Sequence, residues 1–160
     1  MVNDNSQLEG GQLVNLTNPQ RTLSKELKSL VNNPDFCDVV FILEEKPLYA
    51  HRAILSARCS KFQQMFNSMK DPKPEIQIPN IRYSVFLGMM QFLYTDSVDI
   101  SLELSLELLG ASTQFSLDLL KSLCERILEQ SVNIENVGKN HIPFLKERVT
   151  YLNRVDISRC

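Results

Sequence analysis

The sequence has few of the residues from which cofactor sites and disulfide-stabilised folds are built. Tryptophan is absent, and the 160 residues include only five glycines and four cysteines. The cysteines stand at positions 37, 59, 124 and 160 without a CxxC pair, so neither a zinc site nor a disulfide framework is indicated. A glycine-rich phosphate loop is also missing. We therefore expect reduced thiols, with Cys59 and Cys124 in the core of an intracellular protein, and no cofactor.

Positive charge is not concentrated anywhere, and long apolar runs do not occur. The formal net charge is −2, with no run of lysine and arginine. Because nucleic-acid affinity depends largely on neutralising phosphates, we expect no nucleic-acid partner. No apolar segment approaches the roughly 20 residues that span a bilayer, and the polar, acidic N-terminus does not resemble a signal peptide. We predict a soluble protein of the cytoplasm or nucleus with no membrane partner.

Catalytic signatures are missing as well. The pair His51-Arg52 suggests acid–base chemistry, but the second histidine, His141, is far away in the sequence. A serine or cysteine nucleophile motif does not accompany the pair. The alternative is that His51 hydrogen-bonds the backbone at a strand-to-helix junction. We favour this alternative and do not expect an enzyme.

The stretch that organises the chain covers residues 36–66 and predicts two strands followed by a helix. Five apolar residues at 39–43, rich in β-branched side chains, indicate a buried strand, and a short polar turn leads to its hairpin partner at 47–50. Beyond residue 50 the apolar spacing changes to steps of 4, 3 and 4, through Leu55, Cys59, Phe62 and Phe66. This spacing is one helix face, and we predict a single helix that ends near Met69.

The remaining chain predicts one domain of mixed composition. Its length and its 43% hydrophobic content suit a single core, and residues 1–21 are polar enough to be a flexible lead-in. Residues 75–78 alternate like a half-buried strand, and the wide apolar face of residues 83–94 predicts a helix buried on several sides. Val98 and Ile100 suggest a short edge strand, and two further helices form a C-terminal hairpin. The predicted fold class is α+β, a small mixed sheet surrounded by helices.

Two segments resemble the BTB/POZ domain family. The first is DVVF at 38–41 followed by YAHRAILSARCSKF at 49–62, and the second is FLGMMQFLYT at 86–95. The resemblance covers about residues 22–137 and fades over a divergent tail at 138–160. It implies a BTB/POZ-like fold and a protein–protein interaction module that homodimerises and acts as an adaptor, bringing substrates to a cullin-type ubiquitin ligase. It leaves open a transcription-associated module that recruits corepressors, although the chain lacks a DNA-binding segment.

Residues expected at a dimer interface come from two places in the sequence. A helix predicted at 22–31 carries one apolar stripe, formed by Leu23, Leu27, Leu30 and Val31. The helix is too short to be stable alone in water, so it either covers its own sheet or packs on a second copy. By resemblance, Asp38 and Arg52 match family positions that lie together in a charged pocket at the dimer interface. The alternative is a local surface pair contributing about 0–1 kcal/mol.

The residues expected to face a cullin are Tyr83, Met89 and Tyr94. They lie in the helix predicted at 83–94, whose methionines and aromatic residues otherwise read as core. By resemblance, family members that recruit a cullin often carry an acidic residue near this region. Neither aspartate nor glutamate stands between Pro79 and Tyr94 in this sequence. We therefore expect cullin binding to be weak or absent unless other residues compensate.

Overall fold

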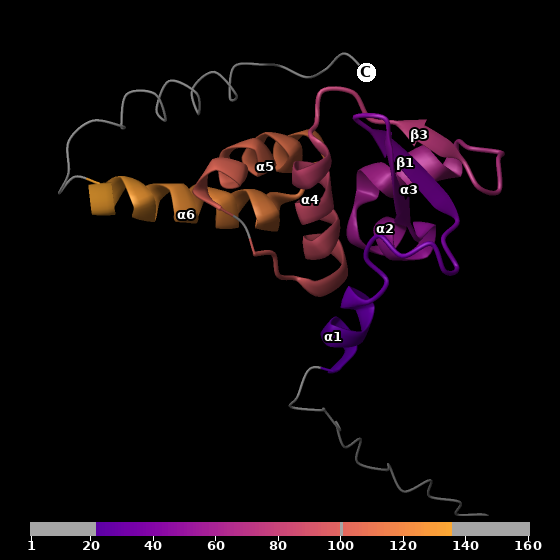
Figure 1. Cartoon of the computed structure of the whole chain (residues 1–160), viewed down its shortest axis with the longest axis horizontal. Helices are drawn as coiled ribbons and strands as arrows, with labels where there is room; N and C mark the ends of the chain where they lie inside the picture. Colours follow the sequence, from indigo (N-terminus) through magenta and orange to yellow (C-terminus); the bar gives the residue numbers. More distant parts are fainter. Residues whose placement is uncertain (1–21, 100, 136–160) are drawn as a thin grey trace, which may run out of the picture.

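The fold is a small sheet packed against helices. The computed structural model describes residues 22–99 and 101–135. Within these residues the elements are α1 (Thr22–Lys28), β1 (Val39–Leu43), β2 (Lys46–Ala50), α2 (Arg52–Arg58), α3 (Ser60–Asn67), β3 (Glu75–Gln77), α4 (Tyr83–Thr95), α5 (Leu102–Gln114) and α6 (Asp118–Glu135). Figure 1 shows the sheet beside α2 and α3, with α4 between this part and the α5–α6 hairpin. This arrangement confirms the α+β fold class.

The sheet is mixed and has the strand order β2-β1-β3. β1 pairs with β2 in antiparallel register, with Phe41 opposite Leu48, and with β3 in parallel register, with Phe41 opposite Ile76. The hairpin turn is Glu44-Glu45, and both residues have positive φ, at 50° and 62°. A two-residue turn with positive φ at both positions has a backbone twist that matches the right-handed twist of the flanking strands. This conformation explains the tight connection even without glycine. The predicted hairpin and the third strand are therefore confirmed.

The core is centred on aromatic rings that join the sheet to the helices. The ring of Phe41 lies 5.5 Å from that of Phe62 on α3 and 5.0 Å from that of Phe86 on α4, measured between centroids. Phe115, at the end of α5, stacks on Phe62 at 4.8 Å. All four side chains are buried. Burial of such large rings is the main apolar contribution that holds the sheet and three helices together.

The helix predicted from Arg52 to Met69 is broken, so the prediction of a single helix was wrong. Cys59 is extended, with φ −145° and ψ 116°, and separates α2 from α3. The break turns both segments toward the core, where Leu55 and Phe62 are fully buried. The Cys59 thiol lies 3.4 Å from the carbonyl oxygen of Phe115, which fixes the break against the end of α5.

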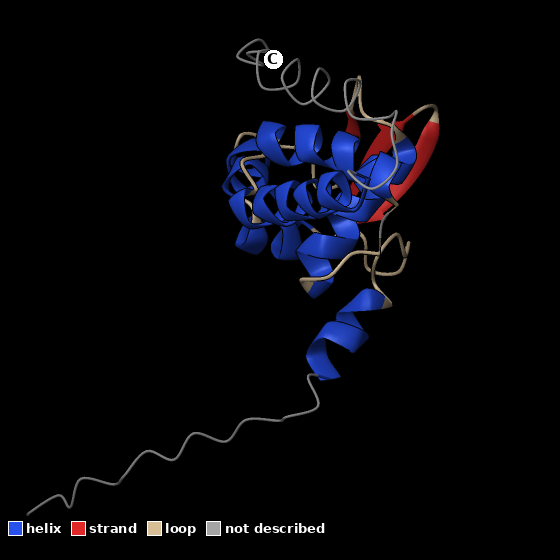
Figure 2. Cartoon of the chain, turned by 90° about the vertical axis from the view of Figure 1, so that its left-hand side faces the viewer, coloured by secondary structure: helices blue, strands red, loops and turns tan. Residues whose placement is uncertain are grey.

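The C-terminal part of the described chain follows the prediction closely. α4 is buried on several sides, and α5 and α6 pack side by side as a hairpin (Figure 1). Figure 2 shows the helices gathered on one side of the sheet, with α1 projecting from the body. The edge strand expected around Val98 is not formed there, and its other residue, Ile100, lies outside the described residues, as do residues 1–21 and 136–160.

Candidate protein-interaction surface

α1 is attached to the body of the protein by a few polar and apolar contacts. The hydroxyl of Ser24 donates to the carbonyl of Thr95 at 2.8 Å. Just beyond α1, the side-chain amide of Asn32 donates to the Tyr83 hydroxyl at 2.9 Å and accepts from the backbone N–H of Tyr49 at 3.1 Å. A seven-residue helix is marginal by itself, so these contacts to α4 and β2 position it.

The predicted apolar stripe is divided between the protein's own core and solvent. Leu27, Leu30 and Val31 are partly buried and pack against the core cluster. Leu23, one turn earlier, is 66% exposed. The stripe thus covers its own chain in part and leaves apolar surface at the projecting end of α1. Packing of this end on a second copy stays a prediction.

Phe36 is an exposed aromatic residue that sequence reasoning missed. Its side chain is 92% exposed, and its backbone has φ 60°. A bulky residue with positive φ is uncommon and indicates a turn held by its surroundings. The position belongs to no apolar repeat in the sequence, so periodicity could not identify it. We use the name α1 edge for Leu23 and Phe36, the two exposed large apolar side chains on the segment that leads into β1.

The structure brings Asp38 and Arg52 together, but through the backbone of Arg52. A carboxylate oxygen of Asp38 accepts the backbone N–H of Arg52 at 2.7 Å, which caps the first turn of α2 and suits the helix dipole. The guanidinium of Arg52 is directed to α3, where it donates to the carbonyl of Phe66 at 3.0 Å and lies 5.3 Å from that ring's centroid. Within one chain the two residues therefore fix both ends of the α2–α3 unit.

His51 connects three segments and matches the structural role expected for it. Its backbone N–H donates to the Tyr94 hydroxyl at 2.9 Å, and its ring Nδ1 lies 2.9 Å from the same oxygen. Because that oxygen already accepts the N–H, its own proton is free for Nδ1, which leaves Nε2–H to donate to the carbonyl of Asp35 at 3.0 Å. Burial raises the pKa of Tyr94 to about 12. The predicted backbone hydrogen bond of His51 is confirmed.

The three residues expected to face a cullin have different surroundings. Met89 is fully buried and Tyr94 is only 4% exposed, so core packing, the alternative weighed above, describes both. Tyr83 is half-buried and bonded to Asn32. Of the three, Tyr83 alone offers appreciable surface to a partner. Any contact of these residues with a cullin stays a prediction.

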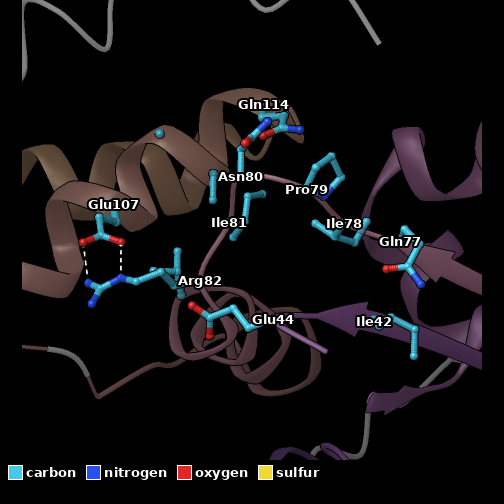
Figure 3. A pocket seen from close by; sticks show the side chains of 13 residues that line it. Ile42, Glu44, Gln77, Ile78, Pro79, Asn80, Ile81, Arg82, Glu107 and Gln114 are labelled. Atoms are coloured by element: carbon cyan, nitrogen blue, oxygen red, sulfur yellow. Dashed lines mark hydrogen bonds and ion pairs between the residues drawn. The ribbon is translucent and has the colours of Figure 1, made fainter. Parts of the chain in front are cut away.

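A groove at the junction of the sheet and α5 was also missed, because its residues are far apart in sequence. It has a volume of about 850 Å³ and is bounded by the loop 78–82. At one end Arg82 forms a two-pronged ion pair with Glu107 on α5, with Nε 2.6 Å from Oε2 (Figure 3). This pairing raises the pKa of Arg82 above its usual value. Nearby, the Glu44 carboxylate accepts the backbone N–H of Tyr83 at 3.1 Å, at the start of α4.

The described residues carry no signature of metal chemistry or of membrane insertion. No group of three or more histidine, cysteine, aspartate or glutamate side chains among them is placed to bind a metal ion. None of the helices in the described ranges is long and apolar enough to cross a bilayer. Burial raises the pKa of the Cys124 thiol to about 11, which keeps it protonated and unreactive at neutral pH.

Comparison with known sequences identifies related proteins. The sequence model of the BTB/POZ domain matches residues 27–132. An Arabidopsis thaliana protein named "Arm repeat protein interacting with ABF2" is 44% identical over 111 residues, which is 68% of this chain and 16% of that protein. The Homo sapiens "BTB/POZ domain-containing protein 19" is 34% identical over 120 residues, or 71% of this chain and 40% of that protein. The chain thus spans less than half the length of these relatives.

Solved structures support the same fold. The BTB domain of human gigaxonin superposes with a TM-score of 0.61 at 19% identity, over 74% of this chain and 99% of that one. The BTB domain of zebrafish PATZ1 gives 0.58 at 23% identity, over 73% of this chain and 99% of the other. At these identities the likeness establishes the architecture, while specific partners require their own argument.

Proposed function

Because the chain belongs to the BTB/POZ domain family, whose members are protein-interaction modules, we propose that it homodimerises through the α1 edge and acts as an adaptor. The observation that carries the proposal is the exposure of Leu23 and Phe36, 66% and 92%, whereas most other large apolar side chains of the described residues are buried. Contiguous exposed apolar patches mark interaction sites, and we propose that these two side chains contribute to one in the dimer. We place this activity in the cytoplasm or nucleus.

A two-fold arrangement suits this surface. In such a dimer the same patch contacts its copy, so every contact made by Leu23 and Phe36 occurs twice. Stable dimers of this kind often bury more than about 2,000 Å². Asp38 and Arg52 lie at the start of α2, beside the loop that carries Phe36, and we propose that they form the polar rim of the interface.

The experiment is light scattering over a concentration series with matched surface variants. The double variant Leu23→Asp with Phe36→Ser should be a folded monomer, because a carboxylate in an apolar seam is costly to desolvate. Leu119→Asp is the control, since Leu119 on α6 is 61% exposed and comparable to Leu23. It should remain dimeric. A wild-type chain that is monomeric at tens of micromolar, or a double variant that stays dimeric, would refute the proposal.

We further propose that α4 of this chain binds a cullin only weakly, which limits an adaptor role through this helix. The motivation is the absence of acidic residues between Pro79 and Tyr94, since complementary charge speeds encounter and fixes register. Calorimetry with a panel of cullins should give dissociation constants no tighter than micromolar. Tight binding that survives Tyr83→Ala would show that a cullin contacts this chain elsewhere.

A further inference from the structure

The groove between the sheet and α5 has the features of a built binding site. Its floor is apolar and includes Ile42 of β1, Ile81 and Ala111. Three side-chain amides stand around this floor: Gln77 on β3, Asn80 in the following loop and Gln114 at the end of α5 (Figure 3). We call it the amide-rimmed groove. None of its lining residues belongs to the α1 edge, so it is a second surface.

The rim amides have hydrogen-bonding capacity to spare. Within the described part of the chain, the side chains of Gln77, Asn80 and Gln114 engage in no hydrogen bond. A primary amide donates two hydrogen bonds and accepts through its oxygen, so it can match both the N–H and the C=O of one peptide unit. Three such groups around an apolar floor complement a ligand that alternates polar backbone with apolar side chains.

One end of the groove has excess negative charge. Arg82 is the cation there, and its pKa is raised by Glu107 first, then also by Glu44 and Glu103. Two carboxylates, those of Glu44 and Glu107, therefore line the groove with a single guanidinium. The ammonium of Lys61, which is not among the lining residues, donates to the backbone carbonyl of Gln114 at 2.6 Å. A ligand that enters the groove meets an acidic end at Glu44, which favours a positively charged group.

We propose that the amide-rimmed groove binds an extended segment of a partner protein that carries an aliphatic side chain and a lysine or arginine. The aliphatic side chain packs on the floor, the peptide backbone meets the rim amides, and the cation lies beside Glu44. The volume of about 850 Å³ accommodates a few residues. The groove is open to solvent along one side, whereas a site for a small molecule usually buries most of its ligand.

Gly110 provides a direct way to close the groove. It lines the wall from within α5, and its φ is not positive, so any residue with a helical backbone fits there. Gly110→Leu places a branched side chain in the groove, whereas Gly110→Ala adds only a methyl group and serves as the matched control. Glu44→Gln removes the charge but keeps an oxygen that can accept the N–H of Tyr83.

The test begins with a phage library of random heptapeptides selected on the immobilised full chain. Enriched peptides should combine a valine, leucine or isoleucine with a nearby lysine or arginine. As labelled synthetic peptides they should bind Gly110→Leu at least about tenfold more weakly than Gly110→Ala, because the apolar contact is lost. Glu44→Gln should weaken them by about threefold to fivefold, and high salt should abolish that difference.

Nuclear magnetic resonance gives a readout that needs no variant. Adding an enriched peptide to the wild-type chain should shift the side-chain amide signals of Gln77, Asn80 and Gln114. The proposal is overturned if no sequence is enriched, if acidic sequences are enriched, or if these signals do not move. Equal binding to Gly110→Leu and Gly110→Ala also overturns it. So does a change of oligomeric state in Gly110→Leu by light scattering, which would make the groove a contact between copies of this chain.

Discussion

Replacing Phe62 with alanine should remove a large part of the stability of this domain. The Phe62 ring is fully buried and stacks on Phe115 with centroids 4.8 Å apart, while Phe41 of the sheet lies at 5.5 Å. A buried phenylalanine truncated to alanine typically costs about 3–5 kcal/mol, from lost transfer energy and the cavity that remains. Aromatic pairs add about 0.5–1.5 kcal/mol each, so we expect the loss for Phe62→Ala to lie at the upper end of the range of about 3–5 kcal/mol.

Urea unfolding followed by circular dichroism measures the effect. For a domain with a denaturant dependence of about 2 kcal/mol per molar, a loss of 4 kcal/mol lowers the midpoint by about 2 M. Total stability is usually about 5–15 kcal/mol, so the variant should still fold if the domain is not at the low end. The protein concentration is held constant, because dimerisation would also contribute to the midpoint.

Two controls make the result interpretable. Phe62→Leu keeps most of the apolar volume and should lose less than Phe62→Ala. Phe36→Ala removes an aromatic ring that is 92% exposed and should change the free energy of unfolding by less than about 0.5 kcal/mol in the monomer. If the midpoint of Phe62→Ala stays within about 0.3 M of the wild type, the ring does not hold the sheet to the helices and the account of the core is wrong.

Two further predictions concern polar contacts. Burial raises the pKa of Tyr94 to about 12 from 10.0, so its contribution to stability is complete below pH 10 and is lost as the pH rises toward 12. The free energy of unfolding should fall by about 2–3 kcal/mol between about pH 10 and about pH 12. In Tyr94→Phe, thermal unfolding measured over the same pH range should show a correspondingly smaller fall. Asp38→Ala should cost about 1 kcal/mol in urea unfolding, because the N–H of Arg52 loses its cap, whereas Asp38→Asn should cost less. A decline in Tyr94→Phe as steep as in the wild type, or an unchanged midpoint in Asp38→Ala, would contradict these assignments.

The elements that sequence reasoning predicted well are those with local signals. The apolar run at 39–43, bounded by a polar turn, leaves little choice but a buried strand in a hairpin. The wide apolar face of residues 83–94 predicts burial on several sides, and Met89 on this face is fully buried. Local pattern and tertiary packing agree at these places, so the pattern suffices.

The break at Cys59 was missed because periodicity cannot distinguish one helix from two in succession. Steps of 4, 3 and 4 from Leu55 to Phe66 fit a continuous helix, and no proline or glycine marks the interruption. The extended backbone at Cys59 is set by tertiary contact with the end of α5. The groove was missed for a related reason, since β1, the loop 78–82 and α5 meet only in the folded chain.

The two proposed surfaces have a joint consequence for affinity. If the α1 edge joins two copies, each dimer presents two amide-rimmed grooves related by the two-fold axis. A partner with two basic, aliphatic segments could then occupy both, and the second binding step would be intramolecular. The gain in apparent affinity can reach about 10²–10⁴-fold when the linker matches the distance between sites, without any new contact. It should vanish in the monomeric Leu23→Asp, Phe36→Ser variant while each single groove keeps its own affinity, so that comparing one-segment and two-segment peptides separates dimerisation from groove binding.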